Sequence, residues 1–147
     1  GPRSPSSFDA GHRDIVRRFP DPMSVATDYY QRTRIFPIMH LIGARRAIVD
    51  EHPWLPAALL KAFERSKQLA LTRLNDTSAT KITLPFVEEQ LQSARTLMGR
   101  EFWPYGVEPN RHVLEAFLAS HHLQGLSPRR LAIEELFHPS TLEGFRI

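Results

Sequence analysis

One histidine of the 147-residue chain lies where general acid–base chemistry could take place. His40 ends the apolar run IFPIMH, and imidazole is the side chain that gains and loses a proton nearest to neutral pH. It could therefore donate a proton to a reacting group or accept one from it. The alternative is a core histidine whose ring nitrogens bond to the backbone, and the residues alone favour this alternative.

A second group of candidates lies in GREFWPYGVEPNR, residues 99–111, which we call the aromatic loop. Trp103 and Tyr105 could stack on the ring of an aromatic ligand. Arg111 could bind a carboxylate through two parallel hydrogen bonds. The alternative is structural: Phe102 and Trp103 pin the loop to the helices behind it, and the last residues of the loop start the next helix. The residues favour the structural alternative.

Arg45 is a further candidate for an anion contact, because it directly follows the apolar run 35–44. The alternative is surface pairing with the acidic residues at 50–51.

A metal site is not predicted, because the adjacent His121 and His122 would point about 100° apart on a helix, and no cysteine and no His-x-x-x-His pair occurs. We therefore expect no metal ion.

The composition argues against several classes of protein. The chain has 41% hydrophobic and 24% charged residues, which is typical of one globular domain. Its net charge is only +3 and its arginines are interspersed with acidic residues, so we expect no nucleic-acid partner. Without cysteine the chain has no disulfide and no thiol nucleophile. No apolar run approaches the ~18 residues that a membrane span needs, so we expect no membrane partner.

Helical periodicity dominates the chain. Asp21 followed by Pro22 is typical of a helix start, and Gly99 and Gly125 are typical of helix ends. Residues at both ends of the chain, outside the helices given next, are predicted to be irregular. The pattern predicts helices over about residues 22–34, 44–51, 53–74, 84–98, 109–124 and 129–137. The longest of these helices carries one apolar stripe that we expect to be buried: Leu55, Leu59, Ala62, Phe63, Ser66, Leu69, Ala70 and Leu74.

The run Ile35–Ala44 is predicted to be a strand buried on both faces, since it is short and largely apolar. One strand cannot make a sheet. The fold class is therefore predicted to be α/β, mostly helical here, with about six helices and one strand. We expect the chain to be the C-terminal part of a larger α/β protein. Within it, residues 1–34 form a crossing segment and the first helix, and residues 35–147 form the strand and the helical part of a lobe.

Several segments of the chain resemble a known family. The run from IFPIMH through EHPW into the long helix resembles the second half of periplasmic-binding-protein-like type II folds, which have two lobes with a ligand cleft between them. More specifically, TRIFPIMHLIGARR, FWPYGVEPNR and GLSPRRLAIEELFHPSTLE resemble the C-terminal half of 4,5-dihydroxyphthalate decarboxylases. The resemblance covers the chain from about Phe8 to Ile147, and its first and second segments are the most distinctive.

The resemblance implies a non-oxidative decarboxylation of 4,5-dihydroxyphthalate to protocatechuate in the cytoplasm, without a cofactor. It raises His40 as the acid–base group to an equal footing with its structural alternative. The residues that could contact such a substrate are the candidates given above, Trp103, Tyr105, Arg111 and Arg45. The expected partner is a small aromatic carboxylate. We expect the chain to be inactive alone and to associate into homo-oligomers if the edges of its strand are left uncovered.

Two other functions remain open at this point. A solute-binding protein of an ABC-type uptake system for an organic anion would use the same fold without chemistry. A self-sufficient helical interaction domain would need the strand to be solitary or to pair between chains.

Overall fold

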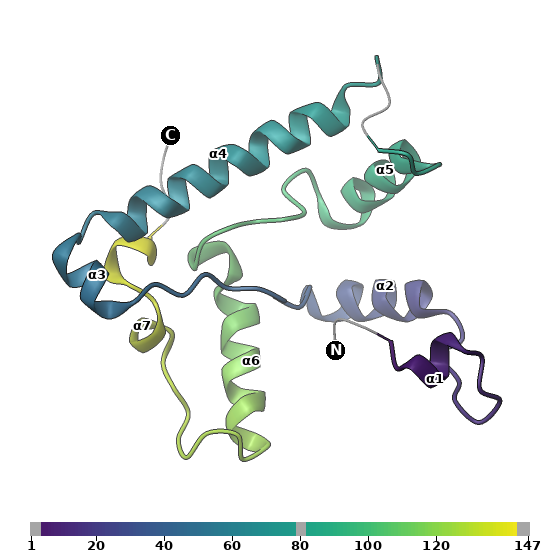
Figure 1. Ribbon diagram of the computed structural model, residues 1–147, viewed down its shortest axis with the longest axis horizontal. Helices are drawn as coiled ribbons and strands as arrows, with labels where there is room; N and C mark the ends of the chain where they lie inside the picture. The colour runs from purple at the N-terminus through teal and green to yellow at the C-terminus, as the bar shows by residue number, and fades with distance from the viewer. Residues whose placement is uncertain (1–3, 79–81, 144–147) are drawn as a thin grey trace. The chain divides into compact units, whose positions relative to one another are not determined.

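The computed structural model describes residues 4–78 and 82–143, and the chain divides into two compact units between Arg34 and Ile35. The first unit contains α1 (Ser6–Asp9) and α2 (Pro22–Thr33) (Figure 1). The short helix α1 was not predicted, because four residues give no readable period.

The helix α2 has the start that the sequence predicts. The Asp21 carboxylate accepts a hydrogen bond from the backbone N–H of Ser24 at 3.0 Å, and Pro22 occupies the first turn. Both features satisfy or remove N–H groups that lack a partner within the helix. The helix ends at Arg34, which adopts a left-handed conformation (φ 57°) and donates its N–H to the Tyr30 carbonyl.

The second unit contains five α-helices and two 3₁₀ turns within its described residues. The helices are α3 (Arg46–Glu51), α4 (Leu55–Asn75), α5 (Val87–Met98), α6 (Arg111–Leu123) and α7 (Ile133–Leu136); the turns are η1 (Glu108–Asn110) and η2 (Pro139–Thr141). Within this unit η2 contacts α4, and α6 contacts both η1 and α7 (Figure 1). The predicted stops at Gly99 and Gly125 are confirmed, and both glycines have positive φ, at 94° and 72°.

A small core connects the aromatic loop to the end of the chain. Val107 of the loop packs with Leu114 and Leu118 of α6 and with Ile133 of α7, and Val107 is only 2% exposed. Three partly buried residues surround this cluster: Leu131, Phe137 and Leu142. The aromatic loop and α7 are therefore fixed against the same face of α6.

The predicted strand Ile35–Ala44 is wrong for this structure. The segment is neither helix nor strand, and no strand occurs among the described residues. A strand is defined by hydrogen bonds to a neighbouring strand, and an apolar run does not supply that neighbour. Most of the large side chains that were expected to be buried are exposed, and Met39 is 66% exposed. We call residues 35–44 the apolar segment.

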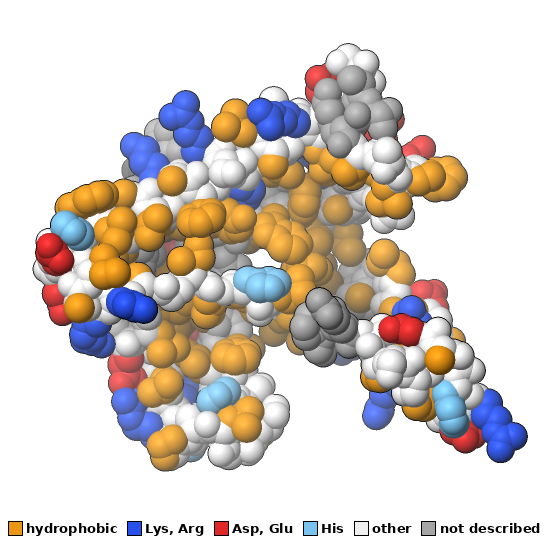
Figure 2. All heavy atoms as spheres, viewed as in Figure 1, with side chains coloured by type: hydrophobic (Ala, Val, Ile, Leu, Met, Phe, Trp, Pro, Cys, Tyr) orange, Lys and Arg blue, Asp and Glu red, His pale blue; other side chains and the backbone are white. Residues whose placement is uncertain are grey.

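Two helix predictions also need correction. Much of the apolar stripe of α4 is exposed rather than buried, including Phe63 and Leu69, and Figure 2 shows hydrophobic side chains on the surface along this helix. The last helix begins at Ile133 rather than near Pro128, because the Glu135 carboxylate accepts a hydrogen bond from the Ala132 N–H at 2.7 Å and fixes the first turn there.

No helix within the described ranges is both long enough and apolar enough to cross a membrane.

Candidate functional site

The aromatic loop is anchored to α4 by the ammonium group of Lys67. Lys67 Nζ donates hydrogen bonds to Glu101 Oε1 at 2.6 Å and to the backbone carbonyl of Trp103 at 3.1 Å. It also lies 2.9 Å from Glu64 Oε1, one turn earlier on α4. The side chain of Lys67 is only 6% exposed. A buried ammonium with two carboxylates and a carbonyl has its donors satisfied, which is the condition under which a lysine can be buried.

The electrostatics of this cluster favour the charged form of Lys67. Burial by itself lowers the pKa of Lys67, but the hydrogen bonds with Glu101 and Glu64 outweigh it, so its pKa lies above the ordinary value. Burial by itself raises the pKa of Glu64, and the hydrogen bonds from Gln68 and Lys67 reverse this effect, so its pKa lies below the ordinary value. The cluster is therefore an ion-paired anchor at neutral pH and not a neutral amine that could act as a base.

Lys67 also contacts the ring of Tyr105. Its Nζ lies 4.8 Å from the ring centroid, within the range of a cation–π interaction. Tyr105 remains 37% exposed, so part of the residue is accessible although the ammonium lies over its ring. One charged group thus fixes both the backbone of the loop and the orientation of an aromatic side chain.

Asn110 holds the other end of the loop. Its Nδ2 donates to the carbonyls of Pro104 at 2.9 Å and of Gly106 at 2.8 Å. Gly106 has φ 88°, a conformation that residues with a side chain rarely adopt. The loop is consequently closed by side-chain donors that bind its carbonyl groups, and this explains how its part before η1, which is neither helix nor strand, becomes ordered.

Trp103 connects the loop to the apolar segment. Its ring centroid lies 5.4 Å from that of Phe36, with the ring planes tilted by 59°. This is the geometry of a favourable aromatic pair. Trp103 is nevertheless 42% exposed. The loop is also held to α4 by Lys67, which donates a hydrogen bond to the Trp103 carbonyl.

Arg111 pairs with two carboxylates of its own chain. Its Nη1 donates to Glu134 Oε1 at 2.9 Å, and its Nε lies 3.5 Å from Glu108 Oε2. The hydrogen bond with Arg111 lowers the pKa of Glu134, and the bond with Glu134 raises the pKa of Arg111. A substrate carboxylate would have to share this guanidinium with them.

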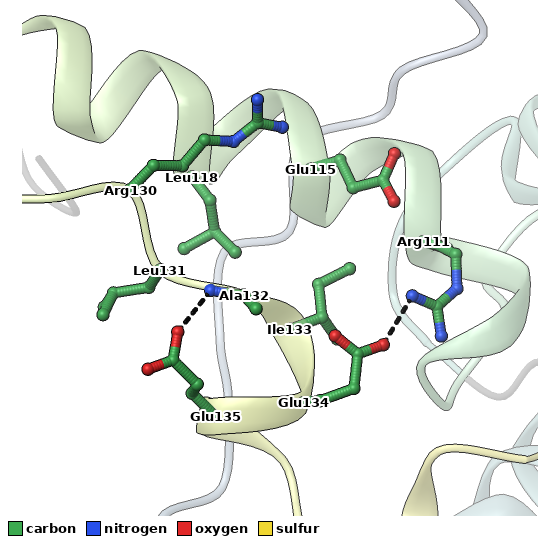
Figure 3. Close-up of a pocket in the computed structure, with 9 residues that line it drawn as sticks. All are labelled: Arg111, Glu115, Leu118, Arg130, Leu131, Ala132, Ile133, Glu134 and Glu135. Atoms are coloured by element: carbon green, nitrogen blue, oxygen red, sulfur yellow. Dashed lines mark hydrogen bonds and ion pairs between the residues drawn. The ribbon is translucent and has the colours of Figure 1, made fainter.

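Arg111 also lines an open pocket of about 330 Å³ between α6 and α7 (Figure 3). Acidic and basic side chains surround an apolar floor in this pocket: Arg111, Glu115, Leu118, Arg130, Leu131, Ala132, Ile133, Glu134 and Glu135. Two of its carboxylates are paired with arginines: Glu134 pairs with Arg111, and Glu135 pairs with Arg129, which lies next to the pocket. The hydrogen bond from Arg129 is the main reason that the pKa of Glu135 falls to about 2.

His40 and Arg45 lie outside that pocket, as do Trp103 and Tyr105. His40 is an exposed residue of the apolar segment, four positions after the Phe36 that contacts Trp103. Arg45 is exposed at the start of α3. The contact between Phe36 and Trp103 therefore brings the segment that carries His40 to the aromatic loop.

No family model matches the chain. A comparison with curated proteins gives one clear relative. Over all 147 residues, the chain is 57% identical to a protein of Comamonas testosteroni named "4,5-dihydroxyphthalate decarboxylase". The predicted resemblance to 4,5-dihydroxyphthalate decarboxylases is confirmed. The chain spans 44% of the length of this decarboxylase, so more than half of the decarboxylase has no counterpart in the residues described above.

Sequence reasoning did not find Lys67 or Asn110. A signal for Lys67 was present, because it interrupts the apolar stripe of α4 between Phe63 and Ala70. A lysine at a core-facing position needs a partner, and Glu64 is spaced to provide one. Asn110 had no comparable signal, since an asparagine near a helix start is ordinarily explained by capping. Among the described residues, no three histidine, aspartate or glutamate side chains gather in a way that could hold a metal ion.

Proposed function

We propose that this chain forms part of a 4,5-dihydroxyphthalate decarboxylase that produces protocatechuate and CO₂. The observation that carries the proposal is the 57% identity to the Comamonas testosteroni decarboxylase, which extends over every residue of the chain. Because the chain spans 44% of that relative, we assign it a share of the site rather than a complete one. The name of the Comamonas testosteroni protein specifies the substrate, and the residues of this chain specify which contacts to test.

The substrate permits this reaction without an electron-accepting cofactor. Each hydroxyl of 4,5-dihydroxyphthalate is para to a carboxylate. Loss of the hydroxyl proton pushes electron density to the carbon that bears the carboxylate, and that carbon accepts a proton from an acid. The ring is briefly dearomatised; the C–C bond then breaks, CO₂ leaves and the ring becomes aromatic again. The protein must supply a proton donor, cations for the carboxylates and an apolar surface.

In this proposal His40 transfers the proton, because an imidazole can both donate and accept a proton and the segment that carries His40 contacts the aromatic loop through Phe36. Tyr105 and Trp103 contact the substrate ring, since each is partly exposed on the loop. Arg45 and Arg111 bind the two carboxylates. Arg111 already has an ordered guanidinium through Glu134, so part of the entropy of positioning it is lost before substrate binds.

We also propose that the chain belongs to one lobe of a two-lobed periplasmic-binding-protein-like type II fold. The exposed apolar segment supports this, because its side chains need a covering surface that the described residues do not give. In the complete fold the apolar segment would pair as a strand. A cytoplasmic location accompanies the decarboxylase proposal, and a secretion signal on the full-length gene product would contradict it.

Turnover in D₂O tests the function directly. The full-length gene product is incubated with 4,5-dihydroxyphthalate, and CO₂ and protocatechuate are quantified by mass spectrometry. We expect equimolar CO₂ and protocatechuate, with one deuterium at the ring carbon that lost its carboxylate. A phthalate without hydroxyl groups is the control, and it should release no CO₂. Measurable binding of the dihydroxylated substrate without turnover would contradict the proposal and support a solute-binding protein.

A further inference from the structure

We infer that Lys67 is a positioning residue for the aromatic wall of the substrate site, acting through Tyr105. This inference rests on the proposed function, because it assigns Tyr105 the substrate ring as its ligand. Four groups around the Lys67 ammonium support the inference. Two carboxylates and one backbone carbonyl hold the ammonium, and the centroid of the Tyr105 ring lies 4.8 Å from Nζ.

The position of Lys67 limits what it can do. Its side chain is 6% exposed, so a substrate carboxylate cannot reach its ammonium without displacing the loop. Its hydrogen bonds with Glu101 and Glu64 keep it protonated at neutral pH, so it cannot serve as a base. Lys67 can therefore influence a ligand only through the groups that it holds, which are the Trp103 carbonyl and the Tyr105 ring.

The charge balance of the cluster explains why a cation is required at this position. Without the ammonium, the carboxylates of Glu64 and Glu101 would lie close together with no cation between them. Glu101 is largely exposed, so it would move toward water and carry the start of the aromatic loop with it. The ring of Tyr105 would lose both its cation and the neighbouring backbone anchor. A loosened ring costs binding energy, because it must be ordered again when a ligand binds.

Kinetics of the full-length gene product test the inference. Lys67→Met should raise KM for 4,5-dihydroxyphthalate about fivefold or more and leave kcat within about twofold, since a wall that binds ground state and transition state alike affects KM. Lys67→Arg should retain most of the affinity because it keeps the charge. Lys61→Met is the matched control, an exposed lysine of the same helix, and should change neither constant. An unchanged KM in Lys67→Met would overturn the inference.

A second variant guards against misfolding of Lys67→Met. Glu101→Gln removes the negative charge of one partner of the ammonium at a largely exposed position, where the fold should tolerate the change. It should raise KM in the same direction by a smaller factor. If Glu101→Gln folds and leaves KM unchanged, the inference fails even where Lys67→Met cannot be purified.

Fluorescence separates this inference from the proposed function. The fluorescence of the 147-residue chain is measured. This chain contains two tryptophans, so Trp54→Phe leaves Trp103 as the reporter of the loop. In that background Lys67→Met should shift Trp103 emission to longer wavelength and increase quenching by acrylamide, and Lys67→Arg should not. Unchanged emission would overturn the anchoring role of Lys67 whatever the turnover. Absence of turnover by the unsubstituted full-length protein would instead contradict the proposed function.

Discussion

The aromatic loop and the apolar segment are both rich in large apolar side chains, and the loop is also held by side-chain donors that bind its backbone carbonyls. Side chains of Lys67 and Asn110 bind three backbone carbonyls of the loop, those of Trp103, Pro104 and Gly106. The apolar segment contributes Phe36 to a ring contact with Trp103 and otherwise exposes most of its large side chains. Apolar content therefore does not fix a conformation by itself; satisfied backbone groups do.

The difference suggests separate roles for the two regions. An ordered loop can present a ring in one orientation, as a binding wall must. A segment that carries an exposed histidine and exposed apolar side chains can adopt its final conformation when a further surface covers it. The contact between Phe36 and Trp103 is where the two regions meet. Four tests can strengthen or remove the contrast between the ordered aromatic loop and the exposed apolar segment.

Substitution of His40 should have the largest effect of all. In the full-length gene product, His40→Ala should lower kcat by at least ~10²-fold, because it removes the proposed proton donor. Its melting temperature should change little, because His40 is exposed. Steady-state kinetics and thermal denaturation provide the two measurements. His12→Ala, an exposed histidine of the first unit, is the control. An unchanged kcat would reassign His40 to a structural role and leave the apolar segment without chemistry.

Loss of the Asn110 amide should reduce stability rather than chemistry. Asn110→Ala leaves the carbonyls of Pro104 and Gly106 without their donor and should lower the free energy of unfolding by about 1–3 kcal/mol. Urea denaturation of this chain measures the change. Asn75→Ala is the matched control, because its amide bonds only the exposed Leu71 carbonyl on the same helix. Equal effects of the two substitutions would show that the loop is not specially anchored.

The ring contact between the regions should contribute a small coupling energy. Phe36→Ala, Trp103→Ala and the double variant form a cycle whose coupling should be about 0.5–1.5 kcal/mol. Trp103→Ala should also destabilise the protein more than it weakens substrate binding. Denaturation curves and binding titrations give both quantities. Coupling of zero would separate the apolar segment from the loop, and a loss of binding without a loss of stability would make Trp103 primarily a ligand contact.

Acid should weaken the anchor of the loop but not the apolar segment. The pKa of Glu64 is lower in the folded protein than its ordinary value of 4.5, so its pairing with Lys67 contributes stability above that value. The contribution is lost as the pH falls below 4.5 and through the lower folded pKa. The effect should be the smallest of the four, because one partly exposed pair is involved. Stability of Glu64→Gln should depend less steeply on pH over that window, and an equal dependence would exclude Glu64 from the anchor.

Local sequence signals predicted the helices better than they predicted the site. The start of α2 follows from Asp21 and Pro22, and the ends of α5 and α6 follow from Gly99 and Gly125, because capping depends on a few neighbouring residues. Five of the predicted helices are present, with ends that differ by a few residues, and the sixth is reduced to its last turn.

The errors concern partners that are distant in sequence. The apolar segment was predicted to be a strand from its composition, but a strand needs a neighbour. The stripe of α4 was expected to be buried throughout, yet Phe63 is exposed. The contact between Lys67 and Glu101 could not be predicted, because Glu101 is 34 positions away and periodicity within one helix carries no information about such a distant partner.

A crystal structure of the full-length gene product with protocatechuate bound tests most directly whether the aromatic loop and the apolar segment form one site. The proposed function requires the ligand ring to contact Tyr105, with the His40 imidazole about 3–3.5 Å from the carbon or oxygen that exchanges a proton. Lys67 should remain bound to Glu101 beneath the loop. A ligand bound away from both regions, or His40 turned away from it, would contradict the account.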